Sequence, residues 1–214
     1  MPRPLLIAYH LIWTGYGHWL PNDPRGSGST SVLKDSIAAL GEIHYGRKLV
    51  QPSGKVVRGF YETAHKVLSY PVLRFNQADI LTIGKAIAEI IDAHKYTCFA
   101  CAIMPDHVHI LIRKHRDLGE EMIEHLQDGS RDRFCERGVC DPGHPVWTDG
   151  GWKRYLFTTG MIRGVIRYIE DNPSEIGWPR EAWAFVTPYD GWPLHPRHNP
   201  NSPWARRLRA ARGR

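Results

Sequence analysis

Two histidines separated by one residue stand in a strand-like run of this chain, His107-Val108-His109 within residues 104–112. Alternate residues of a β-strand project from the same face, so the two imidazoles would lie together while Val108 points into the core. Imidazole is the commonest metal ligand in proteins. The pair could therefore hold a divalent metal ion, although this spacing taken alone is more typical of an ordinary polar strand face.

A second group with chemical potential follows further along the chain, where Tyr168 and Asn172 are four positions apart. On an α-helix such residues lie one above the other. A tyrosine can act as a nucleophile, and an asparagine side chain offers a carbonyl oxygen to a metal. Taken alone, the pattern is more typical of an amphipathic helix whose tyrosine packs against a sheet.

The elements that must position these groups can be read from periodicity and turn residues. We expect three strands or extended segments besides the histidine strand, three helices, and a long loop after the first strand. In chain order these are a strand over 5–13, a loop over 14–31, a helix over 76–96, an antiparallel hairpin of 97–104 with 107–113, a helix over 118–137, an extended segment over 147–158 and a helix over 159–172.

This order of elements predicts an α+β fold of ferredoxin-like type, in which helices pack on an antiparallel sheet. Residues 1–178 are expected to form the catalytic domain, with a long insertion, and residues 179–214 a C-terminal extension with a basic tail. Residues 42–75 resist assignment, and within them 61–68 could form a strand or an irregular segment.

Together the motifs resemble the single-tyrosine HUH transposases, which include insertion-sequence transposases and REP-associated tyrosine transposases. The resemblance spans roughly residues 5–178 and rests on the order and spacing of short motifs. These are Tyr9-His10-Leu11-Ile12-Trp13, the loop from Gly15-Tyr16-Gly17-His18-Trp19 to Pro24-Arg25-Gly26, Met104-Pro105-Asp106-His107-Val108-His109, and Tyr168-Ile169-Glu170-Asp171-Asn172-Pro173.

The resemblance implies that His107 and His109 bind Mg²⁺ or Mn²⁺ and that Tyr168 is the nucleophile. Asn172 matches the position of a third metal ligand, which is often glutamine in relatives. The implied activity is cleavage and rejoining of single-stranded DNA, on hairpin-containing substrates, through a 5′-phosphotyrosine intermediate. Insertion-sequence relatives typically work as homodimers, whereas REP-associated relatives can act as monomers.

Such a reaction needs an unpaired strand, for which the chain offers basic and aromatic side chains. The basic residues that flank the two motifs and could contact phosphate are Arg113, Lys114, Lys153, Arg154, Arg163 and Arg167. The aromatic residues that could stack on bases, or equally form part of the core, are Trp13, Tyr16, Trp19, Trp147 and Trp152. Isolated histidines such as His10 are expected to be structural.

Charge is concentrated at one end of the chain. The net charge is +6, but six of the 28 basic residues lie between Arg197 and Arg214, which leaves 22 basic and 22 acidic residues elsewhere. An approximately neutral body with a basic tail suits a protein with a polyanionic partner, although a solvated tail would look the same. No apolar run is long enough to cross a membrane, and we expect a cytosolic protein.

The cysteines are expected to remain reduced in such a protein, so disulfides are improbable. Cys98 and Cys101 have the spacing of a zinc motif, but they lie in a strand-like run in which residues three apart point to opposite faces. Buried thiols are therefore the preferred interpretation.

Two alternatives to a transposase remain open. The first is a nucleic-acid-binding module, or a domesticated relative, that keeps the fold without the reaction. The second is an HUH nickase whose cleavage is not followed by transposition. The joint presence of His107, His109 and Tyr168 favours an enzyme over a pure binding module, because binding alone does not need all three.

Overall fold

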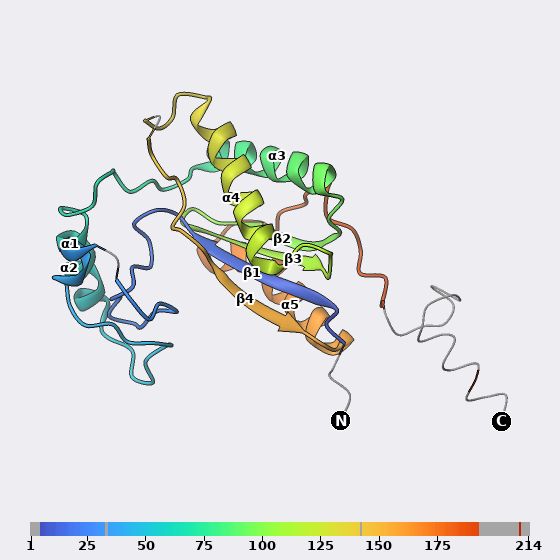
Figure 1. Cartoon of the computed structure of the whole chain (residues 1–214), viewed down its shortest axis with the longest axis horizontal. Helices are drawn as coiled ribbons and strands as arrows, with labels where there is room; N and C mark the ends of the chain where they lie inside the picture. The colour runs from blue at the N-terminus through green and yellow to red at the C-terminus, as the bar shows by residue number, and fades with distance from the viewer. Residues whose placement is uncertain (1–4, 33, 142, 193–209, 211–214) are drawn as a thin grey trace.

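Four antiparallel strands form one sheet in the computed structural model, which describes residues 5–32, 34–141, 143–192 and 210 (Figure 1). The strand order across the sheet is β2-β3-β1-β4. Every neighbouring pair is antiparallel. The strands are β1 (Ala8–Thr14), β2 (Cys98–Ile103), β3 (His107–Arg113) and β4 (Trp152–Leu156).

Helices cover both faces of the sheet (Figure 1). α3 (Gln77–His94) and α4 (Gly119–Cys135) pack side by side on one face, and α5 (Thr159–Asp171) lies on the other. The order β1-α3-β2-β3-α4-β4 with this sheet topology is ferredoxin-like, and α5 is an addition to it. The predicted α+β fold is therefore confirmed, as are the hairpin and the three long helices, with shifts of at most two residues at their ends.

Strand alternation divides the core into two clusters. Tyr9, Leu11 and Trp13 of β1 belong to the cluster under α3 and α4. Ala8 of the same strand belongs to the cluster under α5, together with Leu111 of β3. Because side chains alternate with a period of two, the even-numbered residues of β1 and the odd-numbered residues of β3 face α5. This includes the histidines of β3, which consequently lie on the face opposite to α3 and α4.

Residues 15–32 and 34–74 form a lobe at one end of the sheet, which we call the insertion lobe (Figure 1). Its two ends are held together, because His18 Nε2 lies 2.8 Å from the carbonyl oxygen of Leu73. The backbone N–H of Gly15 donates to the carbonyl of Asp106 at 2.8 Å, which ties the start of the lobe to the turn before β3. The lobe is therefore anchored next to the histidine strand.

The insertion lobe contains two helices that the sequence did not predict, α1 (Asp35–Ala38) and α2 (Gly54–Ala64). The expected strand or irregular segment over 61–68 is wrong in its first part, which belongs to α2. The reason is that the apolar residues of α2 recur at helical spacing and pack on a small separate core. That core consists of Leu20, Ile37 and Ala64, with Phe60, Tyr61 and Leu68 at its border.

Cys135 and Cys140 form a disulfide, contrary to the expectation that all cysteines are reduced. The chain turns back after α4 and brings their Cα atoms to 5.3 Å, within the range that a disulfide requires. Local chain reversal, which composition does not reveal, makes this pairing possible.

Cys98 and Cys101 are buried free thiols, as preferred from the sequence. They do not point to opposite faces, however, because both belong to the cluster under α3 and α4. A register irregularity between Cys98 and Ala100 shifts the alternation by one residue. Burial raises the pKa of the Cys98 thiol to about 12, so this thiol is inert at neutral pH.

Residues 178–192 run along the outer edge of β2. The backbone N–H of Thr187 donates to the carbonyl of Cys98 at 2.8 Å, and Ile103 N–H donates to Glu181 Oε2 at 3.0 Å. This cover satisfies backbone groups of an edge strand. The domain boundary at residue 178 stays a prediction. The arginine-rich tail lies outside the described residues except for Ala210. Within the described part of the chain, no helix has the length and apolar character of a membrane span.

Candidate active site

His107 and His109 begin β3 and project from the face that carries α5, while Val108 is fully buried on the other side. Antiparallel pairing sets His107 opposite Thr14 and His109 opposite Ile12. His109 is 5% exposed, whereas His107 is half-buried. The predicted arrangement of this pair on one strand face is thus what the structure has.

Each of these imidazoles is held through Nδ1 by a neighbour. His107 Nδ1 lies 2.7 Å from Asp106 Oδ1. Burial alone would raise the pKa of Asp106, but the hydrogen bond from His107 and the neighbouring charges of His107, His18 and Arg74 together outweigh it, so the pKa is lowered. Asp106 is therefore an ionised acceptor and His107 donates its Nδ1 hydrogen to it, which leaves the Nε2 lone pair available to a metal.

His109 Nδ1 lies 3.1 Å from His10 Nε2. Burial, reinforced by neighbouring His107, lowers the pKa of His109 to about 2, and burial lowers that of His10 to about 4. Both rings are consequently neutral at physiological pH. When His109 donates its Nδ1 hydrogen to His10, its Nε2 becomes the lone-pair nitrogen that a metal requires.

His10 is a residue that sequence reasoning missed, since it was taken as an isolated structural histidine. It pairs with Leu111 across β1 and β3, which makes His109 its diagonal neighbour on the same face. The sequence does contain one signal, because His10 alternates with Tyr9 and Leu11 in an apolar strand and must therefore project from the opposite strand face. Only the strand register, however, shows that the face of His10 is also the face of His109.

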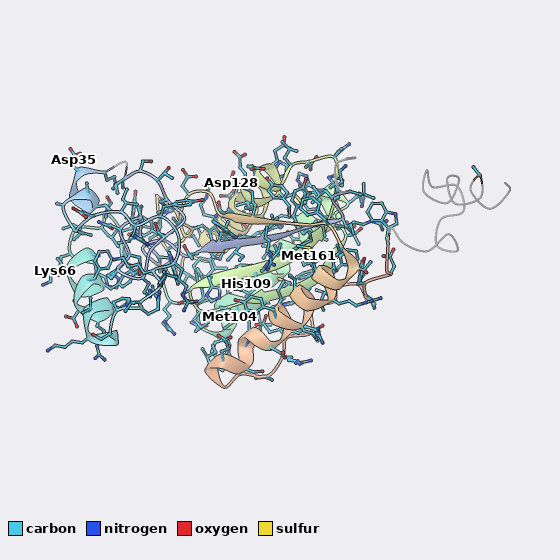
Figure 2. The ribbon with its side chains drawn as sticks, turned by 90° about the horizontal axis from the view of Figure 1, so that it is seen from below. Asp35, Lys66, Met104, His109, Asp128 and Met161 are labelled. Carbon is cyan, nitrogen blue, oxygen red and sulfur yellow. A yellow bond between two sulfur atoms is a disulfide. The ribbon has the colours of Figure 1, made fainter. Side chains whose placement is uncertain are left out.

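Tyr168 lies over the histidines from α5. The helix packs on the sheet through an apolar stripe made of Ile162, Val165 and Ile169. Tyr168 is next to Ile169 in sequence and therefore lies at the edge of this apolar stripe. The Tyr168 ring is edge-on to His109, with 5.4 Å between ring centroids, and remains 49% exposed. All these groups belong to one chain. Figure 2 shows His109 on the sheet with α5 alongside.

Asn172 follows α5 by one residue and begins the short 3-10 helix η1 (Asn172–Ile176). It is 4% exposed, and its side chain makes no hydrogen bond to another residue in the described part of the chain. An asparagine amide offers a carbonyl oxygen that a metal ion can bind.

One cavity of about 800 Å³ is lined by residues of both motifs. His107, His109, Tyr168 and Asn172 all line it. The opposite wall comes from the insertion lobe, and the floor includes the turn before β4. The residues of these other walls that are aromatic or basic are Trp19, Arg25, Arg47, Tyr61 and Trp152.

The insertion-lobe wall is built around a buried carboxylate. Asp23 accepts from Arg25 Nε at 2.9 Å and from Arg25 Nη2 at 2.7 Å, and the Tyr61 hydroxyl also donates to it. The guanidinium of Arg25 in turn lies 4.0 Å from the ring centroid of Trp19. Trp19 has a φ of 51°, which a tryptophan adopts only when its surroundings hold it there.

Replacing Asp23 by asparagine tests how this wall is held. We expect Asp23→Asn to destabilise the insertion lobe by about 1–3 kcal/mol, because Arg25 and Tyr61 lose a buried ionised partner. Amide hydrogen exchange across residues 15–74 should show the loss, while Asp35→Asn at the start of α1 should leave exchange unchanged. Equal protection in the Asp23 variant and the wild type would contradict this role.

The same network makes the lobe sensitive to acid. Burial would raise the pKa of Asp23, but the hydrogen bonds from Arg25 and Tyr61 outweigh it and lower the pKa below its ordinary value. A carboxylate of this kind stabilises the fold fully above its unfolded-state pKa of about 3.9. That stabilisation is lost as the pH falls through the lower folded-state pKa.

The six basic residues expected to contact DNA do not line the cavity. Arg113 and Lys114 lie at the opposite end of β3 from His107, and Arg113 pairs with Asp190 at 3.5 Å. Lys153 points to the other face of the sheet, where it pairs with Glu120 at 3.0 Å. Of the rest, Arg154 lies on the histidine face, and the two on α5 are exposed, namely Arg163 and Arg167. Contact of these six residues with DNA therefore stays a prediction.

The five aromatic residues expected to stack on bases differ in how far they are buried. Trp13 and Trp147 are buried in the core. Tyr16 is partly buried against Tyr70, with 5.9 Å between their ring centroids. Trp19 and Trp152 are 42% and 52% exposed and line the cavity.

Comparison with known proteins adds a likeness of fold. No protein-family model matches the chain, and no curated protein matches it significantly. One similar solved structure is a REP-associated tyrosine transposase bound to a REP hairpin, with 10% identity, a TM-score of 0.44, and coverage of 83% of this chain and 73% of that one. Another is a protein of Deinococcus radiodurans assigned as a transposase, with 14% identity, a TM-score of 0.38, and coverage of 80% and 95%. At these values neither likeness carries a functional conclusion, which must come from the cavity itself.

Proposed function

We propose that this protein is a metal-dependent endonuclease and strand transferase for single-stranded, hairpin-containing DNA, of the transposase type. The observation that carries the proposal is the meeting of two motifs from distant parts of the chain. The histidine pair of β3 and the Tyr168 and Asn172 side chains of the last helical segment line one cavity. A nucleic-acid-binding module has no need of a nucleophile beside two imidazoles that can ligate a metal ion.

Tyr168 is the proposed nucleophile. Its phenolic oxygen would attack a phosphodiester phosphorus, forming a bond between Tyr168 Oη and phosphorus as the bond to the 3′-oxygen breaks. The phenolic proton passes to solvent, and the departing 3′-oxygen takes up a proton to become a hydroxyl. The products are a 5′-phosphotyrosine and a free 3′-hydroxyl. A second 3′-hydroxyl can reverse the step, so strands are exchanged without an external energy source.

The side chains present fit the divalent metal that such chemistry uses. His107 and His109 can each offer Nε2, and Asn172 can offer its amide oxygen. Two imidazoles and one amide oxygen suit Mn²⁺ better than Mg²⁺, which prefers oxygen ligands throughout. A bound divalent ion would polarise the scissile phosphate and offset charge that develops during attack.

The geometry supports a site that is complete within one chain, because Tyr168 lies 5.4 Å, between ring centroids, from His109 of the same chain. We therefore propose that a monomer can carry out cleavage, as REP-associated relatives can. A homodimer is not required to bring the tyrosine to the histidines.

The exposed aromatic residues of the cavity are proposed to stack on unpaired bases. Trp19 stands on the insertion-lobe wall and Trp152 on β4, at the edge of the histidine face. Arg25 lies against Trp19 and fixes its orientation, and exposed Arg47 on the same lobe can contact phosphate. Stacking of this kind accepts any base, so sequence choice would have to come from elsewhere.

Trp19→Ala is expected to weaken binding of single-stranded DNA about 5–150-fold, since stacking contributes about 1–3 kcal/mol per base. Fluorescence anisotropy with a labelled oligonucleotide measures the dissociation constant. Trp19→Phe should recover part of the affinity, and Tyr45→Ala is the matched control, because Tyr45 is an exposed aromatic of the same lobe outside the cavity lining. Unchanged binding by Trp19→Ala would exclude the stacking role.

The reaction itself can be tested with a single-stranded hairpin oligonucleotide and Mn²⁺. A 3′-label should migrate with the protein on a denaturing gel, and a 5′-label should appear on a shortened free strand. The same sequence as a full duplex should give neither product. If hairpin DNA binds but no adduct forms in any divalent metal, the protein is a binding module. If an adduct forms but added 3′-hydroxyl strands never join, it is a nickase without transfer activity.

A further inference from the structure

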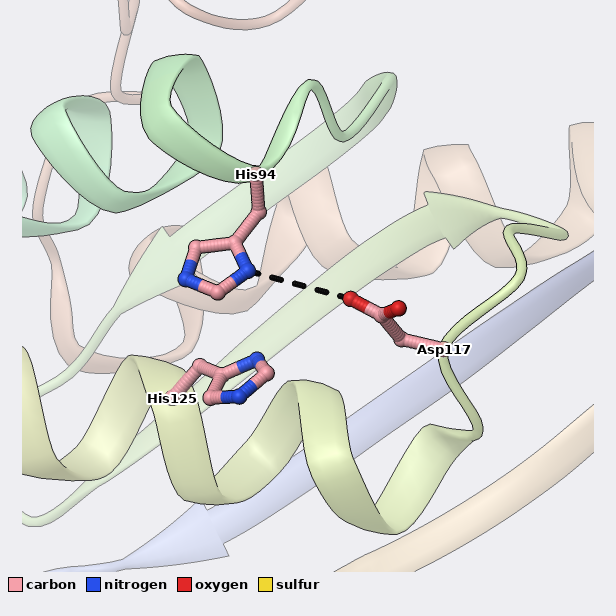
Figure 3. Close-up of side chains that lie close together, drawn as sticks. All are labelled: His94, Asp117 and His125. Atoms are coloured by element: carbon pink, nitrogen blue, oxygen red, sulfur yellow. Dashed lines mark ion pairs between the residues drawn. The ribbon is translucent and has the colours of Figure 1, made fainter.

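A group of metal-ligating side chains lies on the other face of the sheet, where the end of α3 meets the start of α4 (Figure 3). His94 is the last residue of α3, His125 lies on α4, and Asp117 precedes α4 in the connecting loop. One potential ligand atom from each of the three lies within 4.8 Å of the other two. All three side chains are partly buried, so they are held by neighbours and still open to solvent.

The three side chains converge on a common point. His94 Nδ1 is 3.7 Å from Asp117 Oδ2, the contact marked in Figure 3. The rings of His94 and His125 are stacked, with 4.1 Å between centroids. Two imidazoles stacked closely beside one carboxylate do not form a hydrophobic contact.

Tyr96 hydrogen-bonds to two of these three side chains. Its hydroxyl lies 2.8 Å from Asp117 Oδ2 and 2.8 Å from His125 Nδ1. The hydroxyl has one proton to donate, and an ionised carboxylate can only accept. The proton is donated to the carboxylate, which leaves His125 Nδ1 to donate to the hydroxyl oxygen. His125 Nε2 is then a free lone pair.

We propose that His94, Asp117 and His125 bind one transition-metal ion of the Zn²⁺ class, with water as a fourth ligand, and that the ion fastens the end of α3 to the start of α4. The ligand set decides the class of metal, because two imidazoles and one carboxylate suit zinc and its neighbours, whereas Mg²⁺ and Ca²⁺ prefer oxygen ligands. In a tetrahedral zinc site the ligand atoms are about 3.3 Å apart. Small rotations of partly exposed side chains bring this set to that spacing.

Tyr96 is a positioning residue in this site. An outer hydrogen bond that fixes the tautomer and orientation of a ligating imidazole or carboxylate is a regular feature of metal centres. Here one hydroxyl serves both His125 and Asp117. A surface ion pair does not need one hydroxyl that hydrogen-bonds to both the carboxylate and the imidazole, whereas a metal site does benefit from it.

This site is separate from the candidate active site. His107 begins β3 and Arg113 ends it, and Asp117 follows Arg113 by four residues, so β3 separates the two groups by roughly 20 Å along its length. α3 and α4 cover the face opposite to α5, so the sheet also lies between them. Metal binding here neither needs DNA cleavage nor depends on its mechanism.

Metal titration of the full-length chain, without a histidine tag, tests the proposal. The protein carries His107→Ala and His109→Ala, which remove the other histidine pair. Co²⁺ is the probe, since a tetrahedral site gives a visible absorption band, and Zn²⁺ should displace it. We expect one equivalent bound. Adding His94→Ala or His125→Ala should lower affinity at least about 100-fold, and Tyr96→Phe about 10–100-fold.

Controls separate the site from general histidine binding and from unfolding. His44→Ala, an exposed histidine of the insertion lobe, should leave the titration unchanged. Zn²⁺ at about 100-fold above its dissociation constant should raise the Tm by about 5–10 °C in the protein with the site intact and not in the His125→Ala variant. Absence of a saturable Co²⁺ site, or equal affinity with and without His94, would overturn the proposal and show that the cluster is only a hydrogen-bonded network.

Discussion

Replacement of Tyr168 by phenylalanine is expected to abolish the covalent protein–DNA adduct and to lower cleavage of a single-stranded hairpin by about 10⁴-fold or more. The substitution removes only the hydroxyl group that would attack phosphorus. The ring can keep its edge-on contact with His109 and its place over the histidine face. Loss of activity would therefore report loss of the nucleophile, and the quantity to measure is the initial rate of 3′-label transfer to protein.

Two further measurements make this result specific. The dissociation constant for the uncleaved hairpin should change less than about threefold, because one hydroxyl contributes little to binding a long strand. Tyr155→Phe is the matched control, since Tyr155 is 44% exposed but packs edge-on against Tyr9, on the opposite face of the sheet. Adduct formation by Tyr168→Phe at the wild-type rate would show that another residue is the nucleophile.

The second large effect is expected from the histidine strand. His107→Ala should lower Mn²⁺-dependent cleavage by about 10³-fold at a fixed metal concentration, because one of two imidazole ligands is lost. Excess Mn²⁺ should recover part of the activity. His107 is only half-buried, so this variant is less disruptive than one at His109, whose loss would also leave His10 without its partner.

Asp106→Asn offers a milder test of the same site. Asparagine keeps the shape of the side chain but no longer accepts a charge-assisted hydrogen bond from His107 Nδ1. The Mn²⁺ concentration that gives half-maximal activity should rise about 10–100-fold, with little change in the maximal rate. His44→Ala should change neither quantity. If His107→Ala retains the metal dependence of the wild type, the strand histidines do not hold the metal.

Much of the fold and part of the candidate site could be predicted from local periodicity in the sequence. The recurrence of Ile80, Ile83, Ile87 and Ile91 predicted α3, whose start is completed by the capping box of Asn76 and Asp79. A spacing of two placed His107 and His109 on one strand face, and a spacing of four placed Tyr168 and Asn172 close together on the last helical segment. These relations were accessible because they depend only on the repeat of a strand or a helix.

Relations between distant segments were not accessible in this way. His10 joins His109 only through the register of β1 on β3, and α2 becomes a helix by packing on a core that the lobe makes for itself. Arg25 and Trp19 reach the cavity because the lobe folds back over the sheet, whereas Arg113 lies at the far end of the strand that carries the histidine pair. The number of residues between a side chain and the histidine pair therefore does not predict whether that side chain lies at the cavity.

The sequence by itself thus determined the order of the four strands and the three long helices, the shared strand face of His107 and His109, and the type of chemistry that the two motifs allow. The tertiary structure alone decided that the two motifs share one cavity, that the insertion lobe supplies its aromatic and basic wall, and that His94, Asp117 and His125 meet on the opposite face. The physical reason is that helix and strand periods are local properties of the backbone. Strand register, lobe docking and chain reversals depend on which distant surfaces bury each other most favourably.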